Sequence, residues 1–159
     1  MTIRVQIEDF DLATELAQLR AANAMIGATV SFVGTVRDMN DGASIMDMEL
    51  EHYPGMTENA LDGIVVRAKA RWDIVDALVI HRVGLMKPLA QIVLVAVVSA
   101  HRRDAFAACE YIIDYLKTEA PFWKKEQTPE GARWVDARMT DITALGKWDV
   151  QAADTGSTA

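Results

Sequence analysis

Apolar and polar residues alternate along several short stretches of the chain, a pattern typical of β-strands with one buried face. In residues 45–53, three apolar residues alternate with acidic ones. We expect Met46, Met48 and Leu50 to face the interior. Residues 91–100 are apolar nearly throughout, which predicts a strand buried on both faces. Strands are also predicted at residues 3–7, 28–37, 77–83 and 133–138.

Three other segments carry apolar residues every three or four positions, which predicts amphipathic helices. In the most regular one, Ala105 and Cys109 begin a stripe that continues to Leu116. Asp11 and Thr57 stand near the starts of the other two and are predicted to cap them. The predicted helices cover residues 10–20, 57–72 and 104–118.

Turn-forming residues separate these elements, and residues 38–44 and 84–88 are predicted to form turns and loops. Gly34, within a β-rich segment, predicts a bulge or a close backbone approach. Strands and helices alternate without an internal repeat or a clear linker, so we expect one α/β (α+β) domain over residues 1–150. Residues 151–159 are small and polar and are predicted to form a flexible tail.

The 159-residue chain is acidic, with a net charge of -7. This charge argues against a protein that binds nucleic acid through a basic surface. The longest apolar run, residues 92–98, is too short to span a bilayer. The N-terminal residues lack a basic segment followed by an apolar one, so no secretory signal is predicted. A single cysteine cannot form an internal disulfide, and the expected location is cytoplasmic.

Positive charge gathers in residues 99–126, SAHRRDAFAACEYIIDYLKTEAPFWKKE. A local cationic cluster in an acidic protein predicts a pocket for an anion. His101 and Arg102 stand at the start of a predicted helix, where backbone N–H groups also attract anions. Arg37 ends another β-rich segment, and ligands commonly bind where strands give way to loops. The cationic side chains of residues 99–126 are those of His101, Arg102, Arg103, Lys117, Lys124 and Lys125.

Each of these cations also has an ordinary structural interpretation. Lys117, near the end of a helix, complements the helix dipole. Lys124 and Lys125 fit exposed surface charges, and Phe122 and Trp123 fit core positions. From spacing alone, the prediction stops at an anion-binding α/β domain.

The other reactive residue types give weaker indications. Cys109 lies on the apolar stripe of its helix, which favours a buried small hydrophobe over a nucleophile. His52, His81 and His101 lie on three separate elements without the short spacing of metal ligands, so no metal site is predicted. The sequence contains no GxGxxG motif and no P-loop.

Six segments occur in an order that resembles a known family. They are FVGTVRD, LEHYPGMTE, HRVG, SAHR, YLKTEAPFWKKE and WVDAR, within residues 29–148. On these motifs the chain resembles the large catalytic subunit of molybdopterin synthase. The resemblance implies an α/β hammerhead-type single domain with a mixed sheet and flanking helices. It also implies a homodimer of large subunits within a heterotetramer.

The resemblance further implies a reaction and a partner. The family transfers two sulfurs to cyclic pyranopterin monophosphate from a small ubiquitin-like subunit, whose C-terminal Gly-Gly tail carries a thiocarboxylate. The product is molybdopterin, an intermediate of molybdenum cofactor biosynthesis. Because the partner supplies the sulfur, the large subunit needs no cysteine nucleophile, and no cofactor is expected.

The family's functional positions fall on named residues of this chain. Its reactive lysine corresponds to Lys117, and its second essential lysine corresponds to Lys124. Thr35 stands where some family members have lysine, and its hydroxyl still donates a hydrogen bond but brings no charge. The implied substrate-binding positions are Thr35, Val36, Arg37, His101, Arg102, Lys125, Glu126 and Arg138.

Two alternative functions remain open at the level of the sequence. The first is a noncatalytic scaffold that only binds a ubiquitin-like tail, and the presence of both Lys117 and Lys124 argues against it. The second is an enzyme that acts on another phosphorylated heterocycle and needs no protein partner. The pull-down of a small ubiquitin-like protein separates the second alternative from the reaction implied by the resemblance.

Overall fold

The computed structural model describes residues 1–149 except positions 22, 41, 45 and 136–138. The described strands form two four-stranded sheets and one two-stranded sheet. The first sheet has the order β1-β6-β8-β2, in which β1 and β6 are parallel and the other pairs are antiparallel. Its strands are β1 (Thr2–Gln6), β2 (Ala28–Thr35), β6 (Asp76–Arg82) and β8 (Gln91–Ser99).

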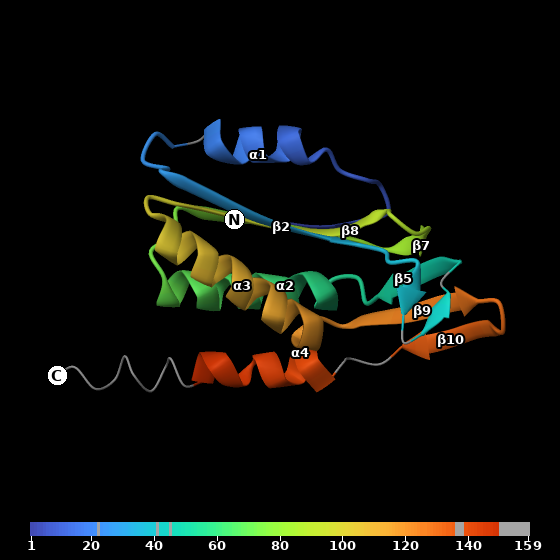
Figure 1. Cartoon of the computed structure of the whole chain (residues 1–159). Helices are drawn as coiled ribbons and strands as arrows, with labels where there is room; N and C mark the ends of the chain where they lie inside the picture. The colour runs from blue at the N-terminus through green and yellow to red at the C-terminus, as the bar shows by residue number, and fades with distance from the viewer. Residues whose placement is uncertain (22, 41, 45, 136–138, 150–159) are drawn as a thin grey trace.

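The second sheet lies beside the first and is antiparallel throughout, in the order β10-β9-β5-β7. Figure 1 shows it at one end of the molecule, where α3 ends. Its strands are β5 (Asp47–His52), β7 (Gly84–Met86), β9 (Phe122–Thr128) and β10 (Gly131–Val135). The two-stranded sheet consists of β3 (Met39–Asn40) and β4 (Ala43–Ser44).

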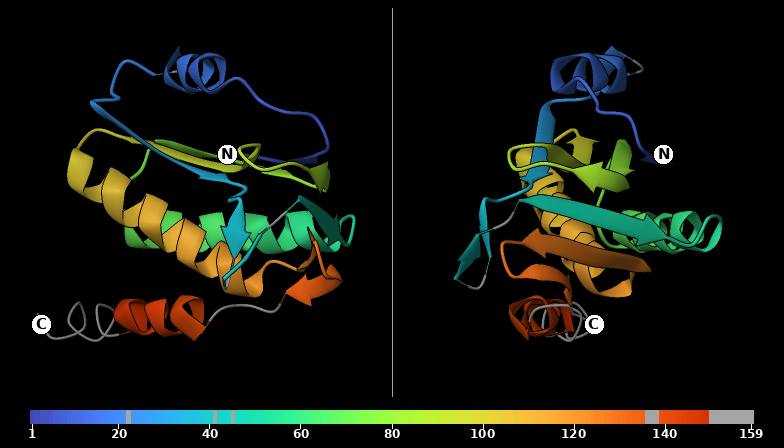
Figure 2. Two further views of the ribbon diagram at one scale, coloured as in Figure 1. Left: turned by 45° about the vertical axis from the view of Figure 1, so that its right-hand side comes forward. Right: turned by 90° about the vertical axis from the view of Figure 1, so that its right-hand side faces the viewer.

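Helices cover both faces of the first sheet. Figures 1 and 2 show α1 on one face, with α2 and α3 side by side on the other. The fourth helix, α4, packs against α3 on the side away from the sheet. The helices are α1 (Leu12–Ala21), α2 (Met56–Arg71), α3 (Arg102–Glu119) and α4 (Met139–Ala144).

The core is organised around β8, which is buried on both faces as its apolar sequence predicts. Successive side chains of a strand point to opposite faces. Val93, Val95 and Val97 therefore join the cluster under α2 and α3, whereas Leu94 and Ala96 join the cluster under α1. The mixed α/β prediction is confirmed, with β8 as the strand that separates the two halves of the core.

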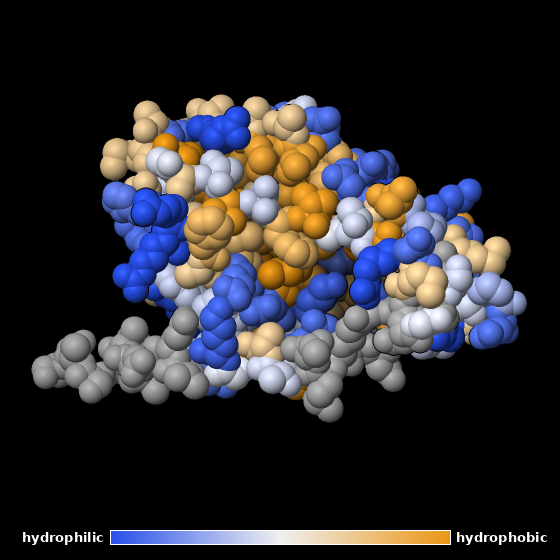
Figure 3. Space-filling view, viewed as in Figure 1, coloured by the Kyte–Doolittle hydropathy of each residue, from blue (hydrophilic) through white to orange (hydrophobic). Residues whose placement is uncertain are grey.

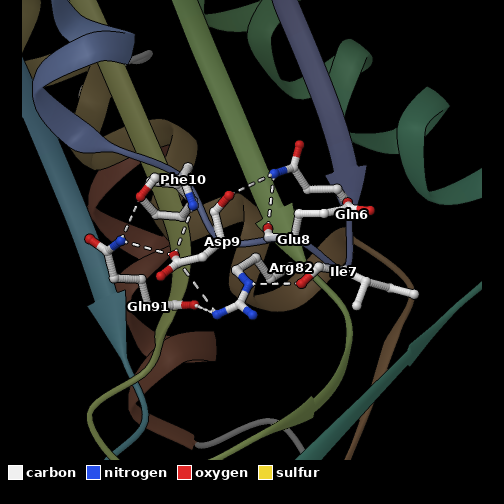
Figure 4. Close-up of polar contacts among 7 residues, drawn as sticks. All are labelled: Gln6, Ile7, Glu8, Asp9, Phe10, Arg82 and Gln91. Carbon is white, nitrogen blue, oxygen red and sulfur yellow. Dashed lines mark hydrogen bonds and ion pairs between the residues drawn. The ribbon is translucent and has the colours of Figure 1, made fainter.

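A polar network ties the N-terminal connection to the first sheet (Figure 4). The guanidinium of Arg82 donates to the carbonyls of Ile7, at 3.0 Å, and Gln91, at 2.9 Å. The amide of Gln91 donates to the carboxylate of Asp9 and to the carbonyl of Phe10. These bonds fix the path from β1 to α1, and Asp11 then caps α1 by accepting from the backbone N–H of Thr14.

Several predicted elements differ from the structure. Residues 84–88 were predicted as a turn, but β7 pairs with β5, and Gly84 enters it with a φ of 87°. Residues 38–44 contain the two short strands β3 and β4 rather than a loop alone. Met46 precedes β5 and is exposed, while Met48 and Leu50 are buried as expected.

Two further predictions concern the ends of elements. Gly55, not Thr57, is the residue that precedes α2, and the Thr57 hydroxyl donates instead to the carbonyl of Pro121. The strand predicted over residues 133–138 is confirmed at residues 133–135 as part of β10, which spans Gly131–Val135, and residues 136–138 lie outside the described part of the chain. The predicted tail, residues 151–159, also lies outside it. Among the described residues, no helix is both long enough and apolar enough to cross a membrane.

Candidate active site

The C-terminal end of α3 and the start of β9 bring the two candidate catalytic lysines onto neighbouring elements. Lys117 is exposed in the last turn of α3, and Lys124 is half-buried on β9. The connection between them is fixed at Pro121, because its carbonyl accepts a hydrogen bond from the buried Thr57 hydroxyl at 3.1 Å. The positions of the two lysines therefore depend on the packing of α2 against this connection.

His81 is buried beside this connection. Its ring stacks on Phe122, with 3.8 Å between the ring centroids. Its Nδ1–H donates a hydrogen bond to the carbonyl oxygen of Arg82 at 2.8 Å, which places the proton of the neutral ring on Nδ1. Burial, with smaller contributions from the charges of Lys117 and His52, lowers the pKa of His81 to about 4, although the hydrogen bond to Arg82 opposes the shift. The imidazole is therefore neutral at pH 7 and lies within electrostatic range of the Lys117 ammonium.

Lys124 is held by a buried carboxylate. Its Nζ lies 3.3 Å from Oε1 of Glu126, whose side chain is only 2% exposed. The other oxygen, Oε2, accepts from Nη2 of Arg133 at 3.1 Å and from its Nε at 3.3 Å. Lys125 points to the opposite face of β9, where its Nζ lies 5.6 Å from the centroid of the Trp134 ring. Lys124 and Lys125 thus occupy different environments although they are adjacent in sequence.

The segment that carries Thr35 and Arg37 is anchored by Val36. The Val36 side chain is buried with Met48 and Leu50, and Phe122 packs against the same cluster. The Val36 amide donates to the carbonyl of Ala90 at 2.9 Å, and its carbonyl accepts from Leu89 at 2.8 Å. Thr35 and Arg37 are exposed on either side of this anchor. The anchor therefore holds the segment against the same sheet that carries Lys124.

The bulge predicted at Gly34 is present. The pairing of β2 with β8 shifts register between Gly34 and Thr35. A Cβ on Gly34 would lie 2.9 Å from Cγ1 of Val93, so the backbone approaches its neighbour as closely as expected. The register shift changes the direction of the chain just before Val36 and Arg37.

His101 and Arg102 lie at the opposite end of α3 from Lys117. Both are exposed, and the fifteen-residue separation corresponds to about 22 Å along a helix axis. His101 precedes the helix in an extended conformation. Within one chain, the cationic residues of segment 99–126 therefore lie at two separate locations, one at each end of α3. Arg138, the remaining candidate, lies outside the described residues.

The one cysteine belongs to the interior. Cys109 is buried on α3, and its Sγ lies 3.6 Å from the carbonyl oxygen of Val95. Burial raises the pKa of its thiol to about 12, so the thiolate is not available at pH 7. The prediction that Cys109 is a core residue is confirmed. Among the described residues, no group of three His, Cys, Asp or Glu side chains is placed to hold a metal ion.

Pattern analysis of the sequence missed two residues of this region. The sequence indicates Arg133 only as the start of a predicted strand, and His81 only as a histidine without the spacing of a metal ligand. The turn-forming residues 129–131 indicate a hairpin, and a hairpin centred there places Arg133 opposite Glu126. The position of His81 near Lys117 depends on contacts between distant segments, for which the sequence pattern contains no local signal.

The chain is similar in sequence and fold to known proteins. A family model described as MoaE protein matches residues 5–119. The chain is 67% identical, over 149 residues, to the molybdopterin synthase catalytic subunit of Ralstonia nicotianae, a match that covers 94% of this chain and 85% of the relative.

Solved structures show the same similarity. The molybdopterin biosynthesis MoaE protein from Burkholderia ambifaria matches with a TM-score of 0.81 and 60% identity, over 93% of this chain and 97% of that one. Molybdopterin synthase from Staphylococcus aureus matches with a TM-score of 0.77 and 34% identity, over 84% of this chain and 96% of that one.

Proposed function

The chain belongs to the MoaE family, and from this premise we propose that it is the catalytic subunit of molybdopterin synthase. It transfers two sulfurs from a thiocarboxylated small subunit to cyclic pyranopterin monophosphate. The identity with the Ralstonia catalytic subunit over almost the whole chain is the observation that carries the proposal. The burial of Cys109 agrees with it, because a partner that brings the sulfur leaves no need for a thiolate on this chain.

The two lysines have different roles in the proposed reaction. Lys117 meets the thiocarboxylate at the substrate and assists transfer, by acid–base chemistry or by transient capture of the acyl group. Lys124, which Glu126 holds, stabilises the negative charge that develops on the substrate or opens the cyclic phosphate. Arg37 binds the phosphate, since an arginine fork fixes the orientation of a phosphate as well as its charge.

Substitution of Lys117 by alanine tests the central role. The assay combines the purified chain, cyclic pyranopterin monophosphate and a thiocarboxylated ubiquitin-like subunit, and detects molybdopterin as its fluorescent oxidised derivative. We expect Lys117→Ala to abolish the product while the circular dichroism spectrum is unchanged, because Lys117 is exposed. Lys69→Ala, an exposed lysine on α2, is the matched control and should keep full activity.

Each other result of this assay has a definite meaning. An active and folded Lys117→Ala protein would contradict the assigned role. No product from the unsubstituted chain, with the small subunit still bound, would favour a scaffold. No product and no binding would leave an anion-binding domain that acts on another substrate.

We propose that the subunit works as a homodimer. The strand β2 is an edge strand of the first sheet, and Phe32 on β2 and Phe106 on α3 are exposed. Figure 3 shows apolar side chains gathered over β2 and α3 on the face toward the viewer. An exposed apolar face of this kind marks an interaction surface. Phe106 lies one helical turn after Arg102, so a subunit that covers Phe106 comes close to Arg102 as well.

A homodimer would bring together cations that lie at opposite ends of α3 within one chain. In this proposal, His101 and Arg102 of one subunit serve the site that contains Lys117 of the other. A mixture of Lys117→Ala chains with His101→Ala/Arg102→Ala chains should then regain activity, because one site of each mixed dimer is complete. Random pairing predicts about a quarter of the unsubstituted activity. Activity no greater than that of the separate parents would contradict the shared site.

We also propose a cytoplasmic location. The single cysteine is buried in its free form, which fits a reducing compartment.

A further inference from the structure

The second sheet buries a carboxylate among apolar side chains. Glu126 on β9 faces Met48 of β5 in the strand register, and both side chains are 2% exposed. Removal of a carboxylate from water is costly unless cations and hydrogen bonds compensate for it. The location of Glu126 therefore requires partners that hold it in place.

Two cations contact the two oxygens of this carboxylate separately. Arg133 directs Nη2 and Nε at Oε2, at 3.1 and 3.3 Å, while Lys124 approaches Oε1 at 3.3 Å. Arg133 lies directly opposite Glu126 across the β9–β10 pair. Lys124 lies two residues before Glu126 and so on the same face of β9. The three side chains form a row that we call the Arg133–Glu126–Lys124 row.

The two cations differ in stiffness. Lysine carries its charge on a flexible stem of four carbons, whereas the arginine fork is planar and rigid. With two nitrogens on one oxygen, Arg133 holds Oε2 of Glu126 in place, and this restricts the positions that Oε1 can take. Oε1 of the buried Glu126 then gives the Lys124 ammonium a fixed partner, while the Lys124 side chain itself is 34% exposed.

We propose that Arg133 is a positioning residue that acts through Glu126 to hold the Lys124 ammonium in the orientation that the reaction needs. The catalytic part of this inference rests on the proposed function, since it takes Lys124 as the residue that stabilises charge on the substrate. The positional part concerns Lys124 alone and is measurable without turnover.

The variant Arg133→Gln removes the rigid fork and keeps a polar side chain at a position that is 38% exposed. Its matched control is Arg4→Gln, which breaks a similar pair with Glu15 at a side chain that is 39% exposed, on the first sheet. We expect the single-turnover rate at saturating substrate to fall about tenfold in Arg133→Gln, because a small displacement of a catalytic group costs this much or more. The rate of Arg4→Gln should match that of the unsubstituted chain.

The positional readout is the rate at which an amine-reactive acetylating reagent modifies each lysine, followed by peptide mass spectrometry. In Arg133→Gln we expect modification of Lys124 to rise several-fold, while Lys69 on α2 serves as the internal reference and stays unchanged. A variant that merely unfolds more readily would raise both rates together. A thermal melt of each variant provides an independent check on folding.

The possible outcomes separate clearly. Faster modification of Lys124 together with slower turnover supports the proposal. Unchanged modification of Lys124, or faster modification with unchanged turnover, overturns it. If the unsubstituted chain makes no molybdopterin, the proposed function fails, and the modification rates still decide whether Arg133 holds Lys124.

Discussion

Burial keeps two reactive side chains of the interior uncharged at pH 7. The pKa of His81 is lowered to about 4 and that of Cys109 is raised to about 12, with desolvation as the largest cause in both cases. The neutral imidazole next to Lys117 adds no positive charge to the site. Because the thiol is protonated, the proposed reaction relies on the lysines rather than on Cys109.

The lowered pKa of His81 predicts a loss of stability in acid. Between about pH 4 and its ordinary pKa of 6.5, the unfolded chain binds a proton that the folded chain does not bind. The contribution of His81 to the free energy of unfolding is therefore complete above about pH 6.5. It is lost as the pH falls toward 4, by roughly 3 kcal/mol in total.

Urea denaturation of the unsubstituted chain and of His81→Gln, at pH 7 and at pH 4.5, measures this effect. Because the variant cannot take up the proton, the difference in unfolding free energy between the two proteins should shrink at the lower pH. A difference that is the same at both pH values would rule out His81 as the group responsible.

At the scale of single residues, the sequence predicts which side chains matter better than it predicts which other side chains they contact. The resemblance assigns roles to Lys117 and Lys124, and the apolar stripe of its helix places Cys109 in the core. The partnership of Glu126 with Arg133 was not predicted, because it depends on the register of a hairpin. The separation of Arg102 from Lys117 follows from the length of α3. The sequence pattern contains no signal that a second chain brings its own Arg102 to the site of Lys117.

Steric contact at the start of β2 makes a glycine necessary there. A Cβ on Gly27 would lie 2.3 Å from the carbonyl oxygen of Ala100, and the Gly27 amide donates to Ser99 at 3.0 Å. We expect Gly27→Ala to lower the free energy of unfolding by roughly 1–3 kcal/mol, because backbone atoms have to move to relieve the overlap. The measurement is the urea midpoint.

The control for this prediction is Gly63→Ala. Gly63 lies within α2, and a Cβ there would meet nothing within 4 Å. Alanine favours the helix over glycine by about 0.5–1 kcal/mol, so this variant should be more stable than the unsubstituted chain. Equal effects of the two substitutions would show that the contact with Ala100 is not the cause.

At the scale of elements, periodicity predicts the strands and helices that have one clear apolar face. The helices α1, α2 and α3 are of this kind, and β8 is recognised instead by its continuous apolar run; each was predicted close to its observed bounds. The strand β9 was missed because charged side chains lie on both of its faces, held by ion pairs and by Trp134. The short strands β3, β4 and β7 depend on pairing with their neighbours and have no periodic signal of their own.

The whole molecule presents an apolar face that the proposed homodimer would cover. Phe106 is 61% exposed on α3, a helix that packs against β2, the edge strand of the first sheet. We expect Phe106→Asp to weaken self-association by about 2 kcal/mol, since a charge at an apolar interface loses its hydration. Sedimentation velocity over a range of concentrations measures the change.

Val66→Asp is the control for the self-association experiment. Val66 is also exposed on a helix, at 51%, but lies on α2. This variant should associate like the unsubstituted chain. Equal weakening by both substitutions would mean that the apolar face over β2 and α3 is not the specific interface.

The two faces of the first sheet are covered unequally. The helices α2 and α3 each contribute several fully buried side chains, whereas every residue of α1, over the described residues 12–21, remains at least partly exposed. Helices with few buried apolar contacts open at a lower free energy than the core does. In hydrogen–deuterium exchange, the amides of α1 should therefore lose protection long before those of β8. Each such opening would bring Leu78, Ile80 and Leu94 briefly into contact with water, so proteases and chaperones would meet the protein first at this face.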